Sequence, residues 1–484
     1  MTMKIALVSL LGNEHISIDQ RNVFNSTEPL GLLYIGGVAK EQGHNVELFH
    51  SYQQANPTEE EIVENILDFQ PDVLGISSMT NTFDRSMDLA EKIKTNLSHM
   101  KIIVGGDHIG TNPSDIENYP IIDVGVYGEG EETFRQLLGH YENRNLKLED
   151  IDGISFIQNG KVRITNPRER IVNRTKLPLP LRDSEIISAS KVGALMYPSP
   201  SEQTGAASLL FQFGCPLGCT YCSATTLYGS NLTSSSPEFV VEEMKQLKNQ
   251  FGINTAFFTD LTFNLRPQLS EELCAQLAEA NLGISWYALV RPTSPKNQPI
   301  LKDSTLEAMV AGGCSKIGFG IESFAESAMK DYHRPTSLQE DERVLRTIDR
   351  LGALSKVFLI LGHPDETVDY YNQIIESLKW LKPDEVRISF LTPFPGTSLW
   401  NSLDNHSSDI LLSTNYDQYT TFNPIMRMKH FLPEELEMQK LRILREYYSS
   451  SEYEQHSKEK IVENPQFERS FTEFHDLLFS KWIM

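Results

Sequence analysis

The sequence predicts an α/β fold that consists of a doubly wound parallel sheet, a partial (β/α)6 barrel and a helical cap. Two patterns lead to this prediction. Five short apolar segments alternate with helical patterns in residues 1–148, and six more do so in residues 201–428. Buried strands that alternate with helices form parallel sheets, and six strand–helix units are too few for an eight-stranded barrel. The cap is predicted over residues 429–484.

Residues 1–148 are predicted to form a Rossmann-like sheet of five parallel strands. The apolar runs that supply the strands are 4–10, 45–49, 72–77, 101–106 and 123–128. The helical patterns are 29–43, 57–69, 83–97 and 131–141. Open parallel sheets bind ligands beyond the carboxyl ends of their strands. The predicted binding edge therefore comprises the loops 11–29, 78–82, 105–112 and 127–131.

Residues 149–200 are predicted to connect the two parts. The segment 153–165 resembles a small hairpin, because Asn159-Gly160 favours the two-residue turn between antiparallel strands. Residues 177–183 alternate leucine with proline and are expected to form an extended linker.

The predicted barrel occupies residues 201–428. Its strand candidates are 207–213, 255–259, 284–290, 316–321, 357–362 and 385–391. One intervening helix begins at Ser236-Pro237, an N-cap followed by proline, and ends before Gly252. Active sites in such barrels gather at the carboxyl ends of the strands. The cap opens with an amphipathic helical pattern and contains no residues that indicate chemistry.

Composition and charge indicate which kinds of partner and which cellular compartment to expect. The formal net charge of −22 and the pI near 5.0 disfavour a nucleic-acid partner, because phosphate binding needs clustered Lys and Arg. The N-terminus lacks a full signal-peptide pattern, and no run of about eighteen apolar residues occurs. We therefore expect a cytoplasmic protein without a membrane span.

Three of the five cysteines fall within eight residues, directly after the first predicted barrel strand. Cys215, Cys219 and Cys222 have the spacing C-x3-C-x2-C. Three thiolates on one short loop can hold a [4Fe–4S] cluster and leave its fourth iron open to an external ligand. Gly214 and Gly218 would let the backbone bend around the cluster.

A structural zinc ion is the alternative reading of this loop. Such a site usually needs four ligands in paired spacings, and no nearby Cys or His supplies the fourth. His333 and His363 are distant in the sequence. Cys274 and Cys314 are predicted to be packing residues, so no second cluster is expected.

The cysteine loop, with Tyr221 before its last cysteine, resembles that of the radical S-adenosylmethionine (SAM) superfamily. The segments GFGIESF, LILGHPDET and LTPFPGTSLW, near the ends of later strands, are also similar to that family. The resemblance implies a radical SAM partial barrel with a [4Fe–4S] cluster on the three cysteines. It further implies SAM contacts from Tyr221, Asp260, Arg291 and Glu322. Plainer roles stay open: Asp260 could cap a turn, Arg291 could balance an acid, and Glu322 could be a surface carboxylate.

The N-terminal part resembles the cobalamin-binding domain that is fused to many radical SAM enzymes. The resemblance implies cobalamin contacts from small or polar residues in three loops: Ser77, Ser78, Met79, Thr80, Gly105, Gly106, Asp107, His108, Gly128, Glu129 and Gly130. Corrinoid proteins that bind cobalt through histidine carry D-x-H-x-x-G after the first strand. Here the Asp and Gly are missing around His15, so we expect no protein histidine on cobalt.

The resemblance implies a cobalamin-dependent radical SAM enzyme. It would cleave SAM reductively and methylate an unactivated carbon, or phosphorus, of a small molecule or peptide. A flavodoxin- or ferredoxin-type protein would donate single electrons, and no residue is assigned to catalysis itself. A cyclase, oxidase or ring-rearranging enzyme without methyl transfer stays open, as does a corrinoid-binding carrier or sensor. A methylthiotransferase is disfavoured, because no cysteine precedes Cys215 to hold a second cluster.

Overall fold

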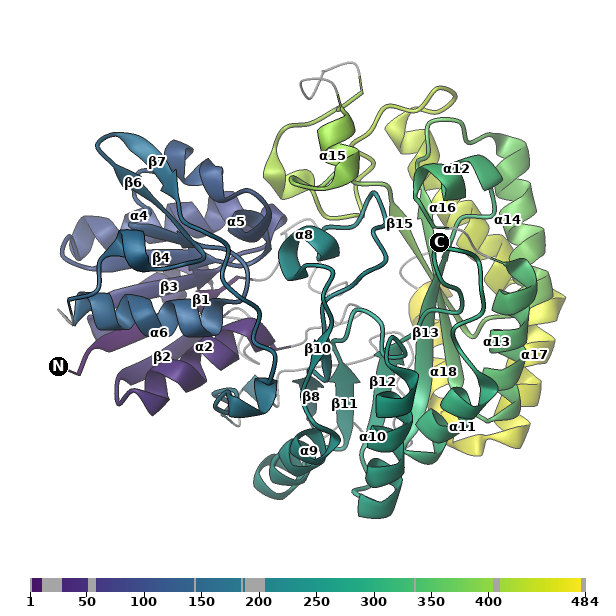
Figure 1. Cartoon of the computed structure of the whole chain (residues 1–484). Helices are drawn as coiled ribbons and strands as arrows, with labels where there is room; N and C mark the ends of the chain where they lie inside the picture. Colours follow the sequence, from purple (N-terminus) through teal and green to yellow (C-terminus); the bar gives the residue numbers. More distant parts are fainter. Residues whose placement is uncertain are drawn as a thin grey trace.

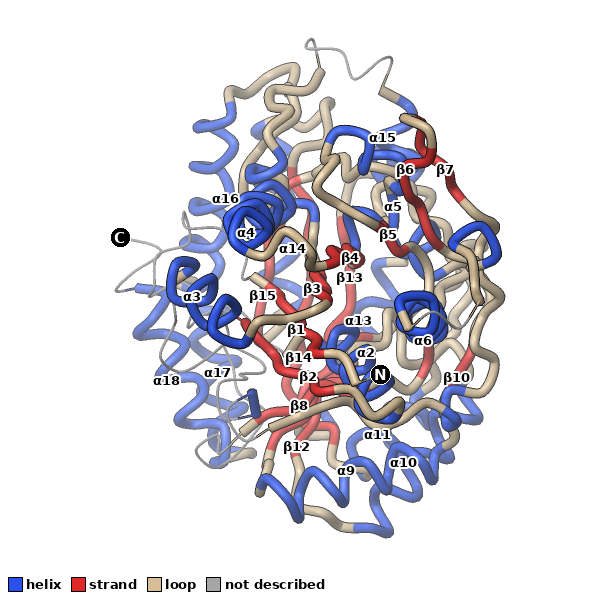
Figure 2. The backbone as a smooth tube through the Cα atoms, turned by 90° about the vertical axis from the view of Figure 1, so that its left-hand side faces the viewer, coloured by secondary structure: helices blue, strands red, loops and turns tan. Residues whose placement is uncertain are grey.

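The computed structural model describes residues 2–10, 28–50, 58–142, 145–183, 186–187, 205–334, 337–403 and 410–479. His15 and most of the predicted loop 11–29 lie outside the described residues. Two sheets stand apart, with the short helix α8 (Ala224–Tyr228) between them (Figure 1). Seen from the side of the N-terminal domain, its strands lie in front of the barrel strands (Figure 2).

The N-terminal domain holds a seven-stranded sheet in the order β2-β1-β3-β4-β5-β6-β7. The five predicted strands are present and parallel: β1 (Lys4–Ser9), β2 (Asn45–His50), β3 (Val73–Ser77), β4 (Lys101–Gly105) and β5 (Val124–Val126). The predicted hairpin adds the antiparallel strands β6 (Ile154–Gln158) and β7 (Lys161–Ile164). Asn159 and Gly160 both adopt positive φ, as the predicted two-residue turn requires.

Helices cover both faces of this sheet, as a doubly wound fold requires. They are α2 (Leu30–Glu41), α3 (Glu59–Phe69), α4 (Phe83–Asn96), α5 (Asp107–Thr111) and α6 (Gly130–Tyr141). Helix α3 begins with a capping box, in which Thr58 and Glu61 each accept the other's backbone N–H. Two separate apolar cores flank the sheet, one around Ile66 and Ile93 and the other around Leu137 and Ile154.

The second domain holds a parallel six-stranded sheet in the order β15-β14-β13-β12-β11-β8. Its strands are β8 (Ala206–Leu209), β11 (Thr255–Phe258), β12 (Ser285–Leu289), β13 (Cys314–Glu322), β14 (Leu354–Leu361) and β15 (Glu385–Phe390). Its helices are α9 (Pro237–Phe251), α10 (Pro267–Ala280), α11 (Asp303–Ala311), α12 (Glu326–Asp331), α13 (Leu338–Arg350), α14 (Val368–Leu381) and α15 (Ser398–Ser402). The predicted partial (β/α)6 barrel is confirmed.

The first predicted barrel strand, 207–213, is divided in two. Its end forms a separate strand, β9 (Gln212–Phe213), which pairs with β10 (Thr233–Ser234) instead of β11. The carboxylate of Asp260 accepts the backbone N–H groups of Phe211 at 3.0 Å and Gln212 at 2.6 Å. These two bonds occupy the backbone groups that would continue the ladder, so the chain leaves the sheet just before the cysteines.

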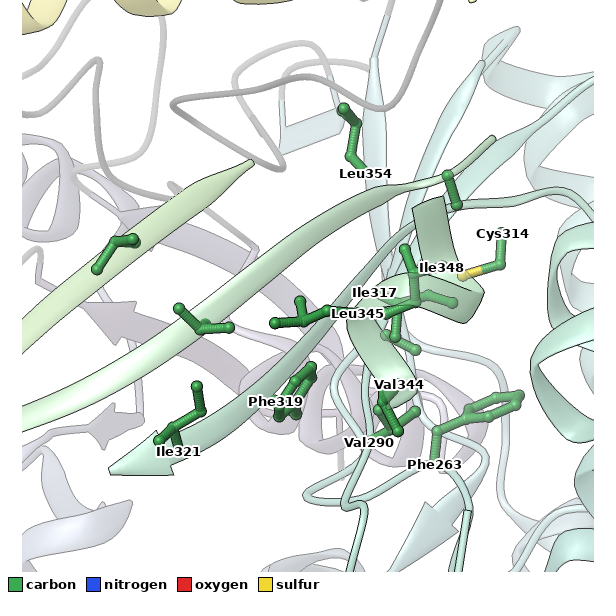
Figure 3. Close-up of a cluster of buried hydrophobic side chains, with 14 of the residues drawn as sticks. Phe263, Val290, Cys314, Ile317, Phe319, Ile321, Val344, Leu345, Ile348 and Leu354 are labelled. Atoms are coloured by element: carbon green, nitrogen blue, oxygen red, sulfur yellow. The ribbon is translucent and has the colours of Figure 1, made fainter. Parts of the chain in front are cut away.

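Along β13, the apolar side chains pack against the helices outside the barrel. Ile317, Phe319 and Ile321 of β13 share one buried cluster with Val344, Leu345 and Ile348 of α13 (Figure 3). Cys314 and Cys274 lie in the same cluster, as predicted for packing residues. The alternate side chains of β13 point the other way, so Lys316 is fully buried and paired with Glu385 of β15 at 2.5 Å.

The C-terminal cap consists of α16 (Pro433–Tyr448), α17 (Ser451–Glu463) and α18 (Glu468–Leu477). The end of α16 and the start of α17 are anchored at the beginning of β15, whereas Leu436 near the start of α16 lies close to Gly362, at the carboxyl end of β14. The hydroxyl of Tyr448 accepts the N–H of Val386 at 2.7 Å, and that of Tyr453 donates to the carbonyl of Asp384 at 3.1 Å. None of the helices in the described residues has the length and apolar character that crossing a membrane requires.

A buried ionic cluster joins the two domains. Arg182, from the predicted linker, donates to Glu28 at 2.9 and 3.0 Å and to Glu243 of α9 at 2.8 Å. It also donates to the carbonyl of Ser208 in β8 at 2.6 Å, while the N–H of Ser208 donates to Glu28. Because all three charged side chains are almost fully buried, this cluster fixes the linker against the barrel.

Candidate active site at the mouth of the barrel

The cysteine loop leaves β9 through a glycine that the backbone geometry requires. Gly214 has φ +98°, and a Cβ there would overlap the carbonyl oxygen of Asn231. The N–H of Cys215 then donates to the carbonyl of Gly229 at 3.1 Å, which closes the loop behind helix α8. The chain between these residues is thus a closed turn that projects its thiols from the end of the first barrel strand.

The three predicted cluster ligands, Cys215, Cys219 and Cys222, lie close enough to influence one another. Burial raises the pKa of Cys222 to about 11, and the other two thiols add to that rise. Burial also raises the pKa of Cys215, and Cys219 contributes. No three Cys, His, Asp or Glu side chains within the described ranges are arranged to hold one metal ion. A cluster differs in this respect, because each thiolate binds a different iron.

Hydrogen bonds and a ring contact join the cysteine loop to the segments that follow β13 and β15. The N–H of Thr220 donates to the carbonyl of Tyr332 at 3.1 Å, and its carbonyl accepts the N–H of Leu399 at 2.8 Å. The ring of Tyr221 packs edge-on against that of Tyr332 at 5.1 Å. These contacts place the loop over the carboxyl ends of the strands, between α12 and α15.

Two guanidinium groups flank one of the thiols. Arg291, which follows β12, is 2 % exposed, and its Nη1 donates to the Sγ of Cys219 at 3.4 Å. Its Nε donates to the carbonyl of Thr293, whereas its Nη2 is buried without a hydrogen-bond partner among the described residues. Arg334 approaches the same sulfur at 3.9 Å. Two guanidinium groups thus contact the sulfur of Cys219, and Arg291 keeps a donor available for an anionic group.

Glu322 ends β13 in a strained conformation. Its φ is +65°, and the pairing of β13 with β14 shifts register between Gly320 and Glu322. The carboxylate lies 3.4 Å from the Nη2 of Arg334, which also donates to the carbonyl of Gly320. A Cβ at Gly320 would collide with that carboxylate. Strain of this kind is typical of functional positions, and here it turns Glu322 toward the cysteine loop.

Asp260, a predicted SAM contact, has a structural role in the described chain. Both of its carboxylate oxygens accept the backbone N–H groups that precede the cysteine loop. Burial raises the pKa of Asp260 to about 7, against the opposing effect of these hydrogen bonds. Asp260 thus binds backbone groups remote in sequence rather than capping the turn that follows it, and its contact with SAM stays a prediction.

A cavity of about 500 Å³ opens between the two domains, next to the cysteine loop. Nine of the eleven predicted cobalamin contacts line it: Ser77, Ser78, Met79, Gly105, Gly106, Asp107, Gly128, Glu129 and Gly130. The barrel contributes Phe213, Gly214, Leu227 and Tyr228. Glycines at so many lining positions expose the backbone, which suits the close approach of a flat macrocycle.

Thr80 and His108 are not among the described residues that line the cavity, which does not favour their predicted role. The ring of His108 is fully buried, with its Nε2 2.7 Å from the carboxylate of Asp115. It stacks on Phe83 at 3.9 Å and meets the edge of Tyr416. His108 is therefore a packing and hydrogen-bonding residue behind the cavity wall.

Glu129 lines the cavity but is already paired. It accepts the N–H of Ile171 at 2.6 Å and lies 3.0 Å from Arg170 and 3.4 Å from Arg174. Both guanidinium groups stack on Phe213, at 4.8 and 4.6 Å from the ring centroid. This cluster joins the linker to the start of the cysteine loop.

Two protein families match separate parts of the chain. Residues 16–138 match the B12 binding domain family, and residues 209–378 match the Radical SAM superfamily. The chain belongs to the cobalamin-dependent radical SAM enzymes. Its cofactors are cobalamin, SAM and a [4Fe–4S] cluster.

Relatives of this cobalamin-dependent radical SAM enzyme extend over most of its length. An uncharacterized methyltransferase of Pyrococcus horikoshii is 29% identical over 93% of both chains. The anaerobic magnesium-protoporphyrin IX monomethyl ester cyclase of Rubrivivax gelatinosus is 22% identical over 82% of this chain and 70% of its own. The structure of TsrM, a radical SAM methyltransferase from Kitasatospora setae with cobalamin and a [4Fe–4S] cluster bound, matches with a TM-score of 0.71 at 14% identity, over 93% of this chain and 89% of TsrM. At this identity, the similarity between this chain and TsrM is a similarity of fold.

Several site residues were missed by the sequence prediction. Arg334 lies in a polar loop after α12, twelve positions beyond Glu322, and Arg174 lies in the segment taken as a linker. Tyr228 follows the cysteines but has no recognisable spacing to them. An arginine that precedes proline in a polar loop was the only local signal for Arg334.

Proposed function

We propose that this enzyme transfers methyl groups from SAM to an unactivated carbon, or phosphorus, of a small-molecule or peptide substrate. The observation that carries the proposal is the cavity that joins nine predicted cobalamin contacts to the cysteine loop. A methyl carrier in this cavity would lie beside the site of SAM cleavage. The names of the Pyrococcus horikoshii relative and of TsrM support this assignment.

In this proposal, Cys215, Cys219 and Cys222 hold the cluster, and its fourth iron takes the amino and carboxylate groups of SAM. The Nη2 of Arg291, which has no hydrogen-bond partner in the part of the chain that the structure describes, fits the SAM carboxylate, since a guanidinium binds carboxylates strongly. The carboxylate of Glu322 is suited to accept the ribose hydroxyl groups, and Arg334 holds it in place.

The donor set also fits the two metal cofactors. Three thiols near two guanidinium groups suit a cluster that must accept an electron, and the glycine-lined cavity suits a corrin ring. When bound, the cluster supplies the electron that cleaves SAM, and cobalamin carries the methyl group. The described residues bind and orient SAM, and the two domains enclose the reacting groups. A flavodoxin- or ferredoxin-type donor would supply the electrons.

The test is an anaerobic purification with cobalamin supplied, followed by assays for iron, sulfide and corrin absorbance. The protein is then incubated with a chemical reductant and SAM that carries a labelled methyl group. We expect 5′-deoxyadenosine and labelled cobalamin. The Cys215/Cys219/Cys222→Ala triple variant should keep the corrinoid but form no 5′-deoxyadenosine. A wild-type protein that binds both cofactors but never takes up the label would contradict methyl transfer.

A second candidate is a radical cyclase or oxidase without methyl transfer, which the likeness to the Rubrivivax gelatinosus cyclase favours. The same experiment separates the two functions, because a cyclase forms 5′-deoxyadenosine without labelling cobalamin. A corrinoid carrier or sensor would bind cobalamin and form neither product.

A further inference from the structure

The inner face of the barrel sheet begins with an apolar half. On β11 and β12, Phe257, Tyr287 and Leu289 form a cluster apart from the main core of the domain, and the rings of Phe257 and Tyr287 stack at 5.0 Å. The Nζ of Lys316 lies 5.5 Å from the centroid of the Tyr287 ring. The apolar half therefore ends at β13, where charged side chains begin.

The charged half of the inner face carries more positive than negative charge. The ammonium groups of Lys316 and Lys356 lie 2.5 and 2.6 Å from one carboxylate, that of Glu385. Arg387 follows two positions later on β15, so its side chain leaves the same face of the strand. One negative group thus faces three positive groups, in a chain whose formal net charge is −22.

Lys440 brings a further cation to this region from the C-terminal cap. It lies on the buried side of α16, because Leu436 and Ile443, one turn before and one turn after it, are buried. Amphipathic helices place apolar residues at such positions. The ammonium group of Lys440 lies 5.0 Å from the ring centroid of Phe390 and 5.4 Å from that of Phe422.

The ring of Phe422 lies beside two cations, because the guanidinium carbon of Arg387 is 4.4 Å from its centroid. Within the described ranges, Lys440 takes part in no ion pair. Burial and the charge of Arg387 lower the pKa of Lys440 to about 8, although Glu437 opposes them. The repulsion between the two cations would fall if an anion bound beside both.

Thr421 holds Phe422 at this place in a strained conformation. Its φ is +63°, in a region that β-branched residues rarely adopt. Its carbonyl accepts the N–H of Phe390 at 2.8 Å, at the end of β15. Strain of this kind persists where the surrounding structure enforces it, and it is typical of ligand sites.

The inner side of β15 is not closed by packing. Arg387 and Ser389 are partly exposed, whereas the alternate residues Val386, Ile388 and Phe390 are buried in the main core. Strand β15 is also an edge of the open six-stranded sheet. A small molecule can therefore approach the cations from this edge.

We propose that Arg387 and Lys440 bind a carboxylate or phosphate group of a substrate whose remainder is flat and apolar. The inference rests on the proposed function, because it names the substrate class of that enzyme. A guanidinium and an ammonium group both bind such anions through charge-assisted hydrogen bonds. The ring of Phe422 and the partly exposed Phe257 and Leu289 offer apolar surface for the remainder.

The experiment measures binding to the full chain loaded with cluster and cobalamin. Benzoate, phenyl phosphate and the neutral benzyl alcohol are titrated calorimetrically at low ionic strength, with S-adenosylhomocysteine present to occupy the proposed SAM site. The variants are Arg387→Gln, Lys440→Met and the double variant. Lys245→Met is the matched control, because Lys245 is exposed on α9 and lies 3.9 Å from Glu242. Thermal unfolding is recorded for each protein.

We expect wild type to bind benzoate or phenyl phosphate but not benzyl alcohol, and the tighter of the two anions identifies the group. Arg387→Gln and Lys440→Met should each weaken that binding about tenfold or more, and the double variant should bind neither anion. Lys245→Met should stay within about twofold of wild type. Lys440→Met should unfold at the same or a higher temperature, because an apolar side chain suits its position.

Equal binding of the charged and neutral probes by wild type, or wild-type affinity in both single variants, would overturn the anion site. Lys440→Met alone decides the question if Arg387→Gln does not fold. A Lys440→Met protein that is less stable but binds the anions normally would show a structural role instead. Because these measurements need no turnover, a wild-type protein that binds an anion but never methylates cobalamin would overturn only the proposed methyl transfer.

Discussion

The guanidinium of Arg291 donates a hydrogen bond to the thiol sulfur of Cys219 at 3.4 Å. Because Arg291 also keeps a buried N–H without a partner among the described residues, it can bind a second anion beside that sulfur. Arg291, at the end of one barrel strand, thus contacts a proposed cluster ligand and offers a donor for the proposed SAM site.

Replacing Arg291 tests this double role. A hydrogen bond to a charged group contributes about 1.5–3 kcal/mol, so Arg291→Gln should lower the rate of 5′-deoxyadenosine formation about tenfold to a hundredfold. Iron content should change little, since three thiols remain. Arg343→Gln, a partly exposed arginine paired with Asp303, is the control. An unchanged rate in Arg291→Gln would show that the residue serves only packing.

Glu322 offers a second test, through SAM affinity. The variant Glu322→Gln keeps the shape of the side chain but removes the charge paired with Arg334 at 3.4 Å. We expect the dissociation constant for SAM, measured by isothermal titration calorimetry, to rise about tenfold. Glu326→Gln, at an exposed position in α12, should bind SAM like wild type. Equal affinities in both variants would remove Glu322 from the SAM site.

Two glycines of the cysteine loop should respond differently to alanine. Gly214→Ala places a Cβ against the Asn231 carbonyl, so the loop cannot close and cluster content should fall strongly. Gly218 has φ +67° but no described heavy atom within 4 Å of a Cβ, so Gly218→Ala should cost only about 1–2 kcal/mol. Iron and sulfide per chain, together with urea unfolding, distinguish the two outcomes. Equal iron contents would argue against a fixed loop.

The buried barrel charges predict a loss of stability in acid. Burial opposes the charge of Glu385, but Lys316 and Lys356 outweigh it and lower its pKa to about 2. A carboxyl whose pKa is lowered by folding contributes stability that is complete above its unfolded pKa. That contribution should be lost as the pH falls from about 4.5 toward 2, as measured by thermal unfolding at each pH. Glu385→Gln should be destabilised at neutral pH, by about 3–5 kcal/mol, and should lose part of this acid dependence.

Helices and strands could be predicted from the sequence, because the apolar pattern and the capping residues of each element lie within or beside that element. The strand-forming run 101–106 and the cap Ser236 before Pro237 appear in the structure at the expected positions. The break between β8 and β9 could not be predicted in this way, because its cause is Asp260, which lies far along the chain. A local pattern indicates a strand but does not show which remote carboxylate will end it.

The residues of the candidate site also differ in whether a local sequence pattern reveals them. The cysteines and Glu322 belong to motifs with fixed spacing, so the sequence identifies them. Arg334 and Tyr228 have no such spacing, because packing between distant segments brings them to the site. The sequence does not show that the ring of His108 turns to Asp115 and Phe83, since a helix residue can face either side of a loop.

The buried ion pairs of Arg182 affect the cooperativity of unfolding between the two domains. Its guanidinium is shared among Glu28, Glu243 and the carbonyl of Ser208, so pulling the N-terminal domain away would leave a buried charge without compensation. Such a penalty couples the unfolding of one domain to that of the other. The two halves should therefore denature in a single cooperative transition, and either half expressed alone should be less stable than it is in the intact chain.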